Sequence, residues 1–152
     1  DEETLRKIAE LAHLAPSACN AQPWKIYAAT GAKAKEVAHA LQGMGMNKFT
    51  EKCPAFFAIA EGKTSFIGKV GGAAHLVPYD VGIFAAHIVL AAQSLGVGSC
   101  IIGWRNEKTL QRVLGLKDKQ CIPLVIALGY PAEDDPLRQK RRKPLEEVFE
   151  IL

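Results

Sequence analysis

At residues 15–24 the chain reads Ala15-Pro16-Ser17-Ala18-Cys19-Asn20-Ala21-Gln22-Pro23-Trp24, a segment that joins two elements of different periodicity. Before it, apolar residues recur at helical spacing from Leu5 onward. Pro16 is expected to end this helix, because the residue before a proline avoids helical torsions. After it, residues 24–30 are expected to form a strand. The chain therefore changes from helix to strand across this loop.

The loop combines small residues with two polar side chains. Its small residues leave backbone N–H groups approachable, while Ser17 and Asn20 add a hydroxyl and an amide. A stiff loop of this kind can hydrogen-bond the edge of a planar heterocycle or a polyol chain. It also fits an ordinary helix-to-strand connection with Ser17 and Asn20 as turn residues. The local chemistry alone favours the ordinary connection, and both interpretations stay open.

Further helices and strands alternate along the chain. The expected elements are a helix over 32–41, a strand over 55–60, a helix over 81–95 capped by Asp80, a strand over 100–102, a helix after Asn106 and a strand over 122–130. The glycine-rich segment 61–78 is expected to be a mobile loop. This alternation, with no internal repeat, predicts an α/β or α+β sandwich with helices on the faces of its sheet.

Composition indicates one globular domain. The 152 residues are 49% apolar and 23% charged, with a net charge of +3 that is too small to indicate a nucleic-acid-binding protein. No uninterrupted apolar run reaches the roughly 18–20 residues of a membrane helix, and the acidic start does not resemble a secretory signal. Four dispersed cysteines, without a C-x-x-C pair, argue against a zinc cage and favour buried, reduced thiols in a cytoplasmic protein.

The expected helix over 81–95 is apolar around nearly its whole circumference. Such a helix must be covered on every side. Either it is the central axis of the core or a second subunit covers part of it. The dimer is the favoured alternative, because symmetric pairing covers such a face at little cost.

Two other segments are candidate binding elements. The glycines of residues 96–104 permit close approach to a flat ligand, although a helix exit followed by a buried strand is favoured on local grounds. The basic cluster 138–144 fits a solvated tail, a nucleic-acid patch or a clamp for a cofactor phosphate, and in isolation the solvated tail is favoured.

Known catalytic motifs are missing from the sequence. It contains no P-loop, no G-x-G-x-x-G opening a helix, no G-x-S-x-G and no H-E-x-x-H, and its four histidines are dispersed. If the protein is an enzyme, we therefore expect a cofactor to supply the chemistry.

Taken together and in this order, the segments resemble the nitroreductase family of FMN-dependent oxidoreductases. The most specific match is A-P-S-x-x-N-x-Q-P-W at 15–24. The others are D-x-G-x-x-A-x-x-x-x-L-A-A at 80–92, G-x-G-x-x-x-x-G at 96–103, L-G-Y-P at 128–131 and K-x-R-K-P-L-E-E at 140–147. The resemblance covers almost the whole chain.

The resemblance implies an α+β fold, an α-β-α sandwich whose mostly antiparallel central sheet is flanked by helices, in a homodimer that binds FMN at its interface. It implies a single domain over 1–152, of which 131–152 is an extended basic tail. By motif matching, the following residues would bind FMN: Pro16, Ser17, Ala18 and Asn20 at the flavin and ribityl chain, Asn47 as a weaker match, Ile102 and Gly103 at the ring, and Lys140 and Arg142 at the phosphate.

The implied chemistry is ping-pong reduction of nitroaromatics, quinones or similar small-molecule oxidants, with NAD(P)H as co-substrate and no catalytic residue or metal supplied by the protein. We expect a cytoplasmic protein with no nucleic-acid or membrane partner. Family members begin with an arginine-rich R-R-S-x-R segment, and here that segment is expected either to lie outside the sequence or to be absent in a reduced variant. The alternative is a flavin-binding homologue without reductase activity, such as a carrier or sensor.

Overall fold

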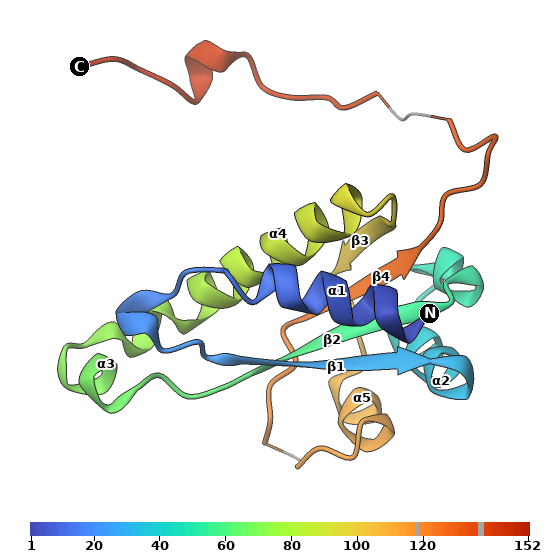
Figure 1. Ribbon diagram of the computed structural model, residues 1–152, viewed down its shortest axis with the longest axis horizontal. Coiled ribbons are helices and arrows are strands. Elements are labelled where there is room, and N and C mark those ends of the chain that lie inside the picture. Colours follow the sequence, from blue (N-terminus) through green and yellow to red (C-terminus); the bar gives the residue numbers. More distant parts are fainter. Residues whose placement is uncertain (118, 137–138) are drawn as a thin grey trace.

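A computed structural model of the chain describes residues 1–117, 119–136 and 139–152 (Figure 1). Its helices are α1 Glu2–Ala12, α2 Gly31–Leu41, α3 Phe66–Val70, α4 Val77–Ser94 and α5 Glu107–Val113, and its strands are β1 Trp24–Thr30, β2 Ala55–Glu61, β3 Gly98–Ile102 and β4 Leu124–Gly129. Short 3-10 turns occupy Ala18–Asn20, Lys48–Lys52, Ala73–Leu76 and Leu145–Glu147. The expected α+β sandwich is confirmed.

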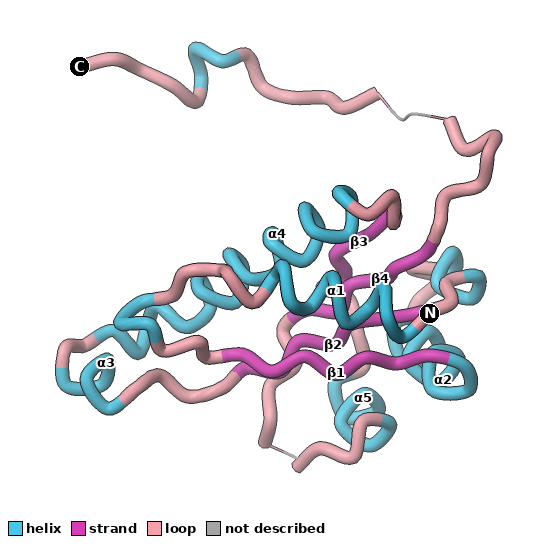
Figure 2. The backbone as a smooth tube through the Cα atoms, in the orientation of Figure 1, coloured by secondary structure: helices cyan, strands magenta, loops and turns pink. Residues whose placement is uncertain are grey.

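The four strands form one antiparallel sheet in the order β1-β2-β4-β3 (Figure 2). Trp24 lies opposite Glu61 and Thr30 opposite Ala55, so β1 pairs with β2 along its whole length. Residues 55–60 of β2 are all buried, because a neighbouring strand flanks β2 on each side and helices cover both faces. The prediction of a strand buried on both faces is therefore confirmed.

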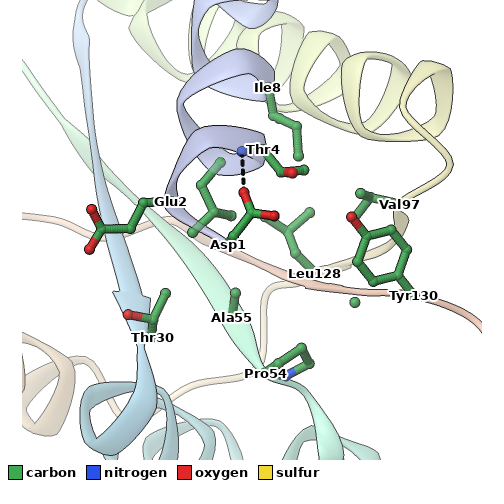
Figure 3. A pocket seen from close by; sticks show the side chains of 12 residues that line it. Asp1, Glu2, Thr4, Ile8, Thr30, Pro54, Ala55, Val97, Leu128 and Tyr130 are labelled. Atoms are coloured by element: carbon green, nitrogen blue, oxygen red, sulfur yellow. Dashed lines mark hydrogen bonds between the residues drawn. The ribbon is translucent and has the colours of Figure 1, made fainter.

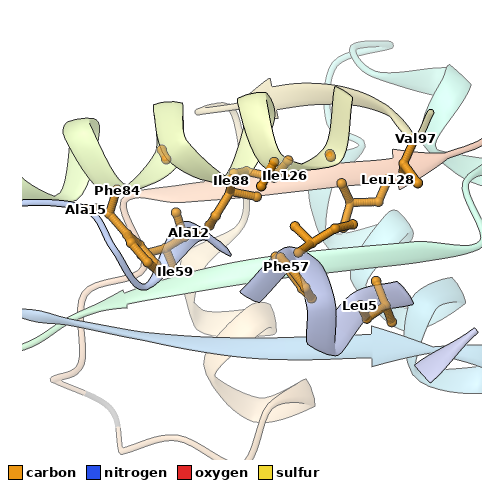
Figure 4. Packing of buried hydrophobic residues seen from close by; sticks show 14 of the residues in the cluster. Leu5, Ala12, Ala15, Phe57, Ile59, Phe84, Ile88, Val97, Ile126 and Leu128 are labelled. Carbon is orange, nitrogen blue, oxygen red and sulfur yellow. The ribbon is translucent and has the colours of Figure 1, made fainter. Parts of the chain in front are cut away.

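Helices cover the two faces of the sheet and make two hydrophobic cores. On one face, α1 and α4 pack on the sheet through residues that include Leu5, Phe57 and Ile88 (Figure 4). On the other face, α2 and α5 pack through residues that include Leu41 and Leu110. The sheet is thus the middle layer of three.

Helix α4 begins earlier than the sequence predicts. Its first residue is Val77, Pro78 lies in its first turn, and Asp80 is inside the helix instead of at its cap. A proline in the first turn is favourable because its missing N–H has no helical acceptor there. The predicted Asp80 cap is wrong, because the Asp80 side chain accepts a hydrogen bond from Ala18, 62 residues away.

One face of α4 packs on the sheet while the other is exposed. Val81, Phe84 and Ile88 are buried, whereas Ile83 is 39% and Leu90 67% exposed. Within one chain, α4 is therefore not the central axis of a core.

By length and composition, Ala73–Ser94 could also cross a membrane, with a mean hydropathy of 1.4. A core helix of a globular domain meets the same criteria, and α4 has a packed face. The expectation of no membrane segment stays a prediction.

Two other local expectations are corrected. Residues 61–78, expected to be a mobile loop, contain α3 and the turn Ala73–Leu76, and their mobility stays a prediction. Cys19, Cys100 and Cys121 are exposed and Cys53 is half-buried, so the expectation of buried thiols is wrong. Cys100 is exposed because β3 is an edge strand, and Cys19 because it lies in a surface bend.

After β4 the chain leaves the sandwich. Residues 131–136 and 139–152 are exposed, and the segment projects away from the sheet with one 3-10 turn (Figure 1). Large apolar side chains in it are exposed: Leu145, Val148, Phe149, Ile151 and Leu152. The described residues of this segment thus lie apart from the sandwich, and the division of the chain into one domain with an extended basic tail stays a prediction.

Candidate functional site

Residues 15–24, called here the Ser17 loop, have an unusual backbone. Cys19, Asn20 and Gln22 have φ values of 52°, 49° and 46°. Residues other than glycine rarely adopt this left-handed region, and such residues concentrate at functional sites when the surrounding structure imposes them. The loop is therefore a candidate binding element between α1 and β1.

Hydrogen bonds inside the Ser17 loop explain how this backbone is held. The Gln22 backbone N–H donates to Ser17 Oγ at 2.9 Å, and Gln22 Nε2 donates to Asn20 Oδ1 at 3.1 Å. In the described part of the chain, neither the Ser17 hydroxyl hydrogen nor the Asn20 amide nitrogen has an acceptor. Both donors remain available to a ligand, and the exposed Pro16 and half-buried Ala18 lie beside them.

Helix α4 supports the Ser17 loop from behind. The Ala18 backbone N–H donates to Asp80 Oδ1 at 3.0 Å, and the Trp24 ring stacks on Phe84 with centroids 4.5 Å apart and planes 8° from parallel. The sequence reasoning did not identify Asp80 as part of the site. Its place at the start of the D-x-G motif was the available signal.

A second predicted element, the Gly103 turn (residues 102–104), follows β3. Ile102 is buried, whereas Gly103 is exposed, and a Cβ added to it would meet no atom within 4 Å. Arg105 Nη1 donates to the Gly103 carbonyl at 2.7 Å. The turn therefore presents an open backbone that a flat ligand can approach.

Asn47 lies beside the Gly103 turn. Its Nδ2 donates to the Leu41 carbonyl at 3.1 Å and to the Trp104 carbonyl at 3.5 Å, and its own φ is 53°. The structure thus brings three predicted residues together: Asn47, Ile102 and Gly103. The amide nitrogen of Asn47 is already engaged, so its Oδ1 is the atom left for a ligand.

The Ser17 loop and the Gly103 turn lie at different edges of the sheet. The loop precedes β1 and the turn follows β3, and these are the two edge strands, with β2 and β4 between them. At about 4.8 Å between neighbouring strands, the edges are about 14 Å apart. One chain therefore does not form a single slot from both elements.

Lys140 and Arg142 lie in the exposed tail, away from the sheet (Figure 1). Arg142 Nη1 donates to the Arg141 carbonyl at 3.0 Å, and Lys143 Nζ lies 3.8 Å from Glu147 Oε2. Arg138, the first residue of the predicted basic cluster, lies outside the described residues. The described residues of this cluster, 139–144, lie on a segment that projects away from the sandwich (Figure 1).

A cavity of about 230 Å³ lies at the opposite end of the sheet, where α1 begins (Figure 3). It is mainly apolar, with Ile8, Val97 and Leu128 in its wall, and the Thr4 N–H donates to Asp1 Oδ1 at 2.8 Å beside it. The predicted site residues do not line this cavity. It therefore does not correspond to the predicted site.

The described residues offer no metal cage, and two of the four thiols are not activated. They contain no group of three or more His, Cys, Asp or Glu side chains able to hold a metal ion. Although Cys121 is exposed, partial desolvation of its thiol raises the pKa to about 11, with Glu107 and Glu61 adding to the effect, and desolvation also raises the pKa of the half-buried Cys53. Because thiolates are the reactive form, neither residue is activated at neutral pH.

Comparisons with known proteins agree on one family. A family model described as the nitroreductase family matches residues 1–130. A protein from Archaeoglobus fulgidus, named as an NADH dehydrogenase/NAD(P)H nitroreductase, is 30% identical over 142 residues that cover 88% of this chain and 75% of that protein.

Solved structures show the same fold. A nitroreductase family protein from Streptococcus pneumoniae is similar with a TM-score of 0.79 and 28% identity, covering 99% of this chain and 89% of that one. An FMN-dependent nitroreductase from Mycobacterium smegmatis, solved in complex with NADPH, has a TM-score of 0.77 and 23% identity, covering 99% and 88%. The latter likeness concerns the fold alone.

Proposed function

Because this chain belongs to the nitroreductase family, we propose that it is an FMN-dependent oxidoreductase that takes electrons from NAD(P)H and passes them to small-molecule oxidants such as nitroaromatics or quinones. The Ser17 loop carries this proposal. It combines a left-handed backbone with two side-chain donors that have no acceptor among the described residues, in the segment that matches the family most closely. The Archaeoglobus protein is named as an NAD(P)H nitroreductase and the Mycobacterium protein as an FMN-dependent nitroreductase, in agreement with this cofactor and co-substrate.

The residues of the two elements suit FMN chemically. The Ser17 hydroxyl and Asn20 amide can donate to oxygen and nitrogen acceptors on the flavin and ribityl chain, with Pro16 and Ala18 against its surface. Ile102 and Gly103 would lie against the ring, because the open backbone of Gly103 permits close approach. Asn47 Oδ1 would accept from a ring or ribityl donor.

A homodimer would bring these elements together. The Ser17 loop of one copy and the Gly103 turn of the other would form the slot that one chain lacks, because the two elements lie at opposite sheet edges. The exposed apolar face of α4 and the apolar side chains of the tail provide surfaces for this pairing. In such a pair, Lys140 and Arg142 would hold the FMN phosphate.

FMN, when bound, supplies the acceptance of hydride from NAD(P)H and its transfer to the oxidant. The chain's own residues bind the cofactor and position the co-substrate against it, which lowers the barrier by proximity. NAD(P)H and the oxidant would use the same pocket in turn, in a ping-pong sequence. No protein base is required, because water can exchange the protons.

The test is a visible spectrum of the purified full chain with FMN, without oxygen, before and after adding NADH or NADPH. We expect binding close to one FMN per chain, followed by bleaching of the flavin absorbance and recovery on adding a quinone. Failure to bind FMN would contradict the proposed cofactor. Binding without bleaching by either nucleotide would contradict the reductase activity and indicate the non-reducing flavoprotein.

A further inference from the structure

Asp80 is an acidic residue at a buried position of α4. The side chain is 4% exposed on the inner side of α4, and in the described residues no salt bridge joins it to a cation. Burying a carboxylate is unfavourable unless its oxygens are hydrogen-bonded. The N-terminal turn of α4 offsets part of this cost, because the helix dipole favours negative charge there.

Asp80 accepts a hydrogen bond from the backbone of the Ser17 loop. Ala18 N donates to Asp80 Oδ1 at 3.0 Å, and Ala18 directly precedes the left-handed residues Cys19 and Asn20. Ala18 also lies between the two side chains proposed as FMN donors, Ser17 and Asn20. Movement of its peptide group would therefore change the direction of both donors.

Phe84 lies four residues after Asp80, on the same face of α4. It stacks on Trp24, the last residue of the Ser17 loop. One face of one helix thus contacts the loop at Ala18 and again at Trp24. Between these two contacts lie the three residues with left-handed torsions, Cys19, Asn20 and Gln22.

We infer that Asp80 is the positioning residue of the FMN-binding loop: by accepting from the Ala18 N–H, it holds the Ser17 and Asn20 donors in the orientation that binds flavin. This inference rests on the proposed function. Asp80 does not touch the ligand itself in this arrangement. It acts through the Ala18 peptide group.

Two variants separate the hydrogen bond from the rest of the side chain. Asp80→Asn keeps an acceptor oxygen and removes the charge. Asp80→Leu has a similar size, suits the buried environment and removes the acceptor, so the helix is expected to remain folded. Gln111→Ala is the matched control, because Gln111 is also buried on a helix and its side chain also makes one hydrogen bond to backbone, from Nε2 to the Gln120 carbonyl at 2.9 Å.

The measurements are FMN affinity by titration, the visible spectrum of bound FMN and the melting temperature without FMN. We expect Asp80→Leu to bind FMN about 10- to 100-fold more weakly, which corresponds to the loss of a hydrogen bond to a charged group. Its melting temperature should change little, and its flavin spectrum should shift. Asp80→Asn should keep the wild-type affinity within about threefold, and Gln111→Ala should keep it fully.

Each outcome decides the inference. Wild-type affinity in Asp80→Leu would overturn it, and so would equal losses of affinity in Asp80→Leu and Gln111→Ala, which would indicate a general effect of destabilisation. If Asp80→Leu does not fold, Asp80→Ala, which also removes the acceptor, decides: a loss of FMN affinity of about 10-fold or more supports the inference, and wild-type affinity overturns it. A wild-type chain that binds no FMN would instead refute the proposed function.

Discussion

Leu90 lies on the outward face of α4 and reports on the proposed dimer. Complete burial of a leucine side chain stabilises by about 1.5–3 kcal/mol. Because Leu90 is 67% exposed in one chain, an interface that covers it would gain about 1–2 kcal/mol per copy. Symmetry brings two copies of Leu90 into a homodimer, so the total is about 2–4 kcal/mol.

Leu90→Gln removes this gain while keeping the side chain's length and a high helix propensity. At about 1.4 kcal/mol per factor of ten, we expect the dissociation constant of the dimer to rise about 30- to 1,000-fold. Sedimentation velocity over a dilution series measures this constant directly. Lys35→Gln is the control, because it places a glutamine at an exposed position of α2, on the other side of the sheet.

The reasoning would be refuted by a wild-type chain that sediments as a monomer while binding one FMN. It would also be refuted if Leu90→Gln and wild type had the same dissociation constant. In either case the exposed face of α4 would need another explanation, and the slot would have to form within one chain.

Three further perturbations test separate parts of the structure. The double variant Lys140→Ala/Arg142→Ala should weaken FMN binding at least tenfold and leave riboflavin binding unchanged, because riboflavin lacks the phosphate that these side chains would bind; equal losses for both ligands in fluorescence titrations would exclude the phosphate role. Phe57→Ala should lower the free energy of unfolding by about 3–5 kcal/mol in urea denaturation, because Phe57 is fully buried between the sheet and α1; a loss below 1 kcal/mol would contradict the described core. Alkylation of Cys121, followed by mass spectrometry of the peptide, should keep accelerating up to about pH 11, since its pKa is raised to that value and the thiolate is the reactive form; a plateau near pH 9 would show an ordinary thiol.

The elements that the sequence predicts well are those whose local pattern matches their burial. The strand at 24–30 was predicted with its observed bounds, because Pro23 and Gly31 limit it on both sides. The strand at 55–60 was predicted because an unbroken apolar run fits a central strand with both faces covered. In these cases, local and tertiary preferences agree.

The predictions that failed depend on contacts distant in sequence. Aspartate is a common helix-capping residue, so the sequence predicts a cap at Asp80. The hydrogen bond that Asp80 accepts from Ala18 depends instead on the packing of α4 behind the Ser17 loop. The exposure of Cys100 depends on β3 being an edge strand, which local periodicity does not reveal. Strand order also separates the Ser17 loop from the Gly103 turn within one chain, and their joining into one site between two copies stays a prediction.

The two faces of α4 connect assembly with cofactor binding. Its inner face holds the Ser17 loop through Asp80 and Phe84, and its outer face exposes Ile83 and Leu90. If FMN binds only between two copies, each FMN at 100 times its dissociation constant stabilises the dimer by about 2.7 kcal/mol. With one FMN per chain the dimer gains about 5.4 kcal/mol, more than the loss of about 2–4 kcal/mol expected for Leu90→Gln, so excess FMN should restore that variant's dimer in sedimentation. The same FMN concentration should stabilise the dimer of Asp80→Leu by less, because the affinity of that variant for FMN is lowered. Without FMN, its dimer should be as stable as that of the wild type, because the outer face of α4 is intact. Equal responses of the two dimers to FMN would show that assembly and the Ser17 loop are independent.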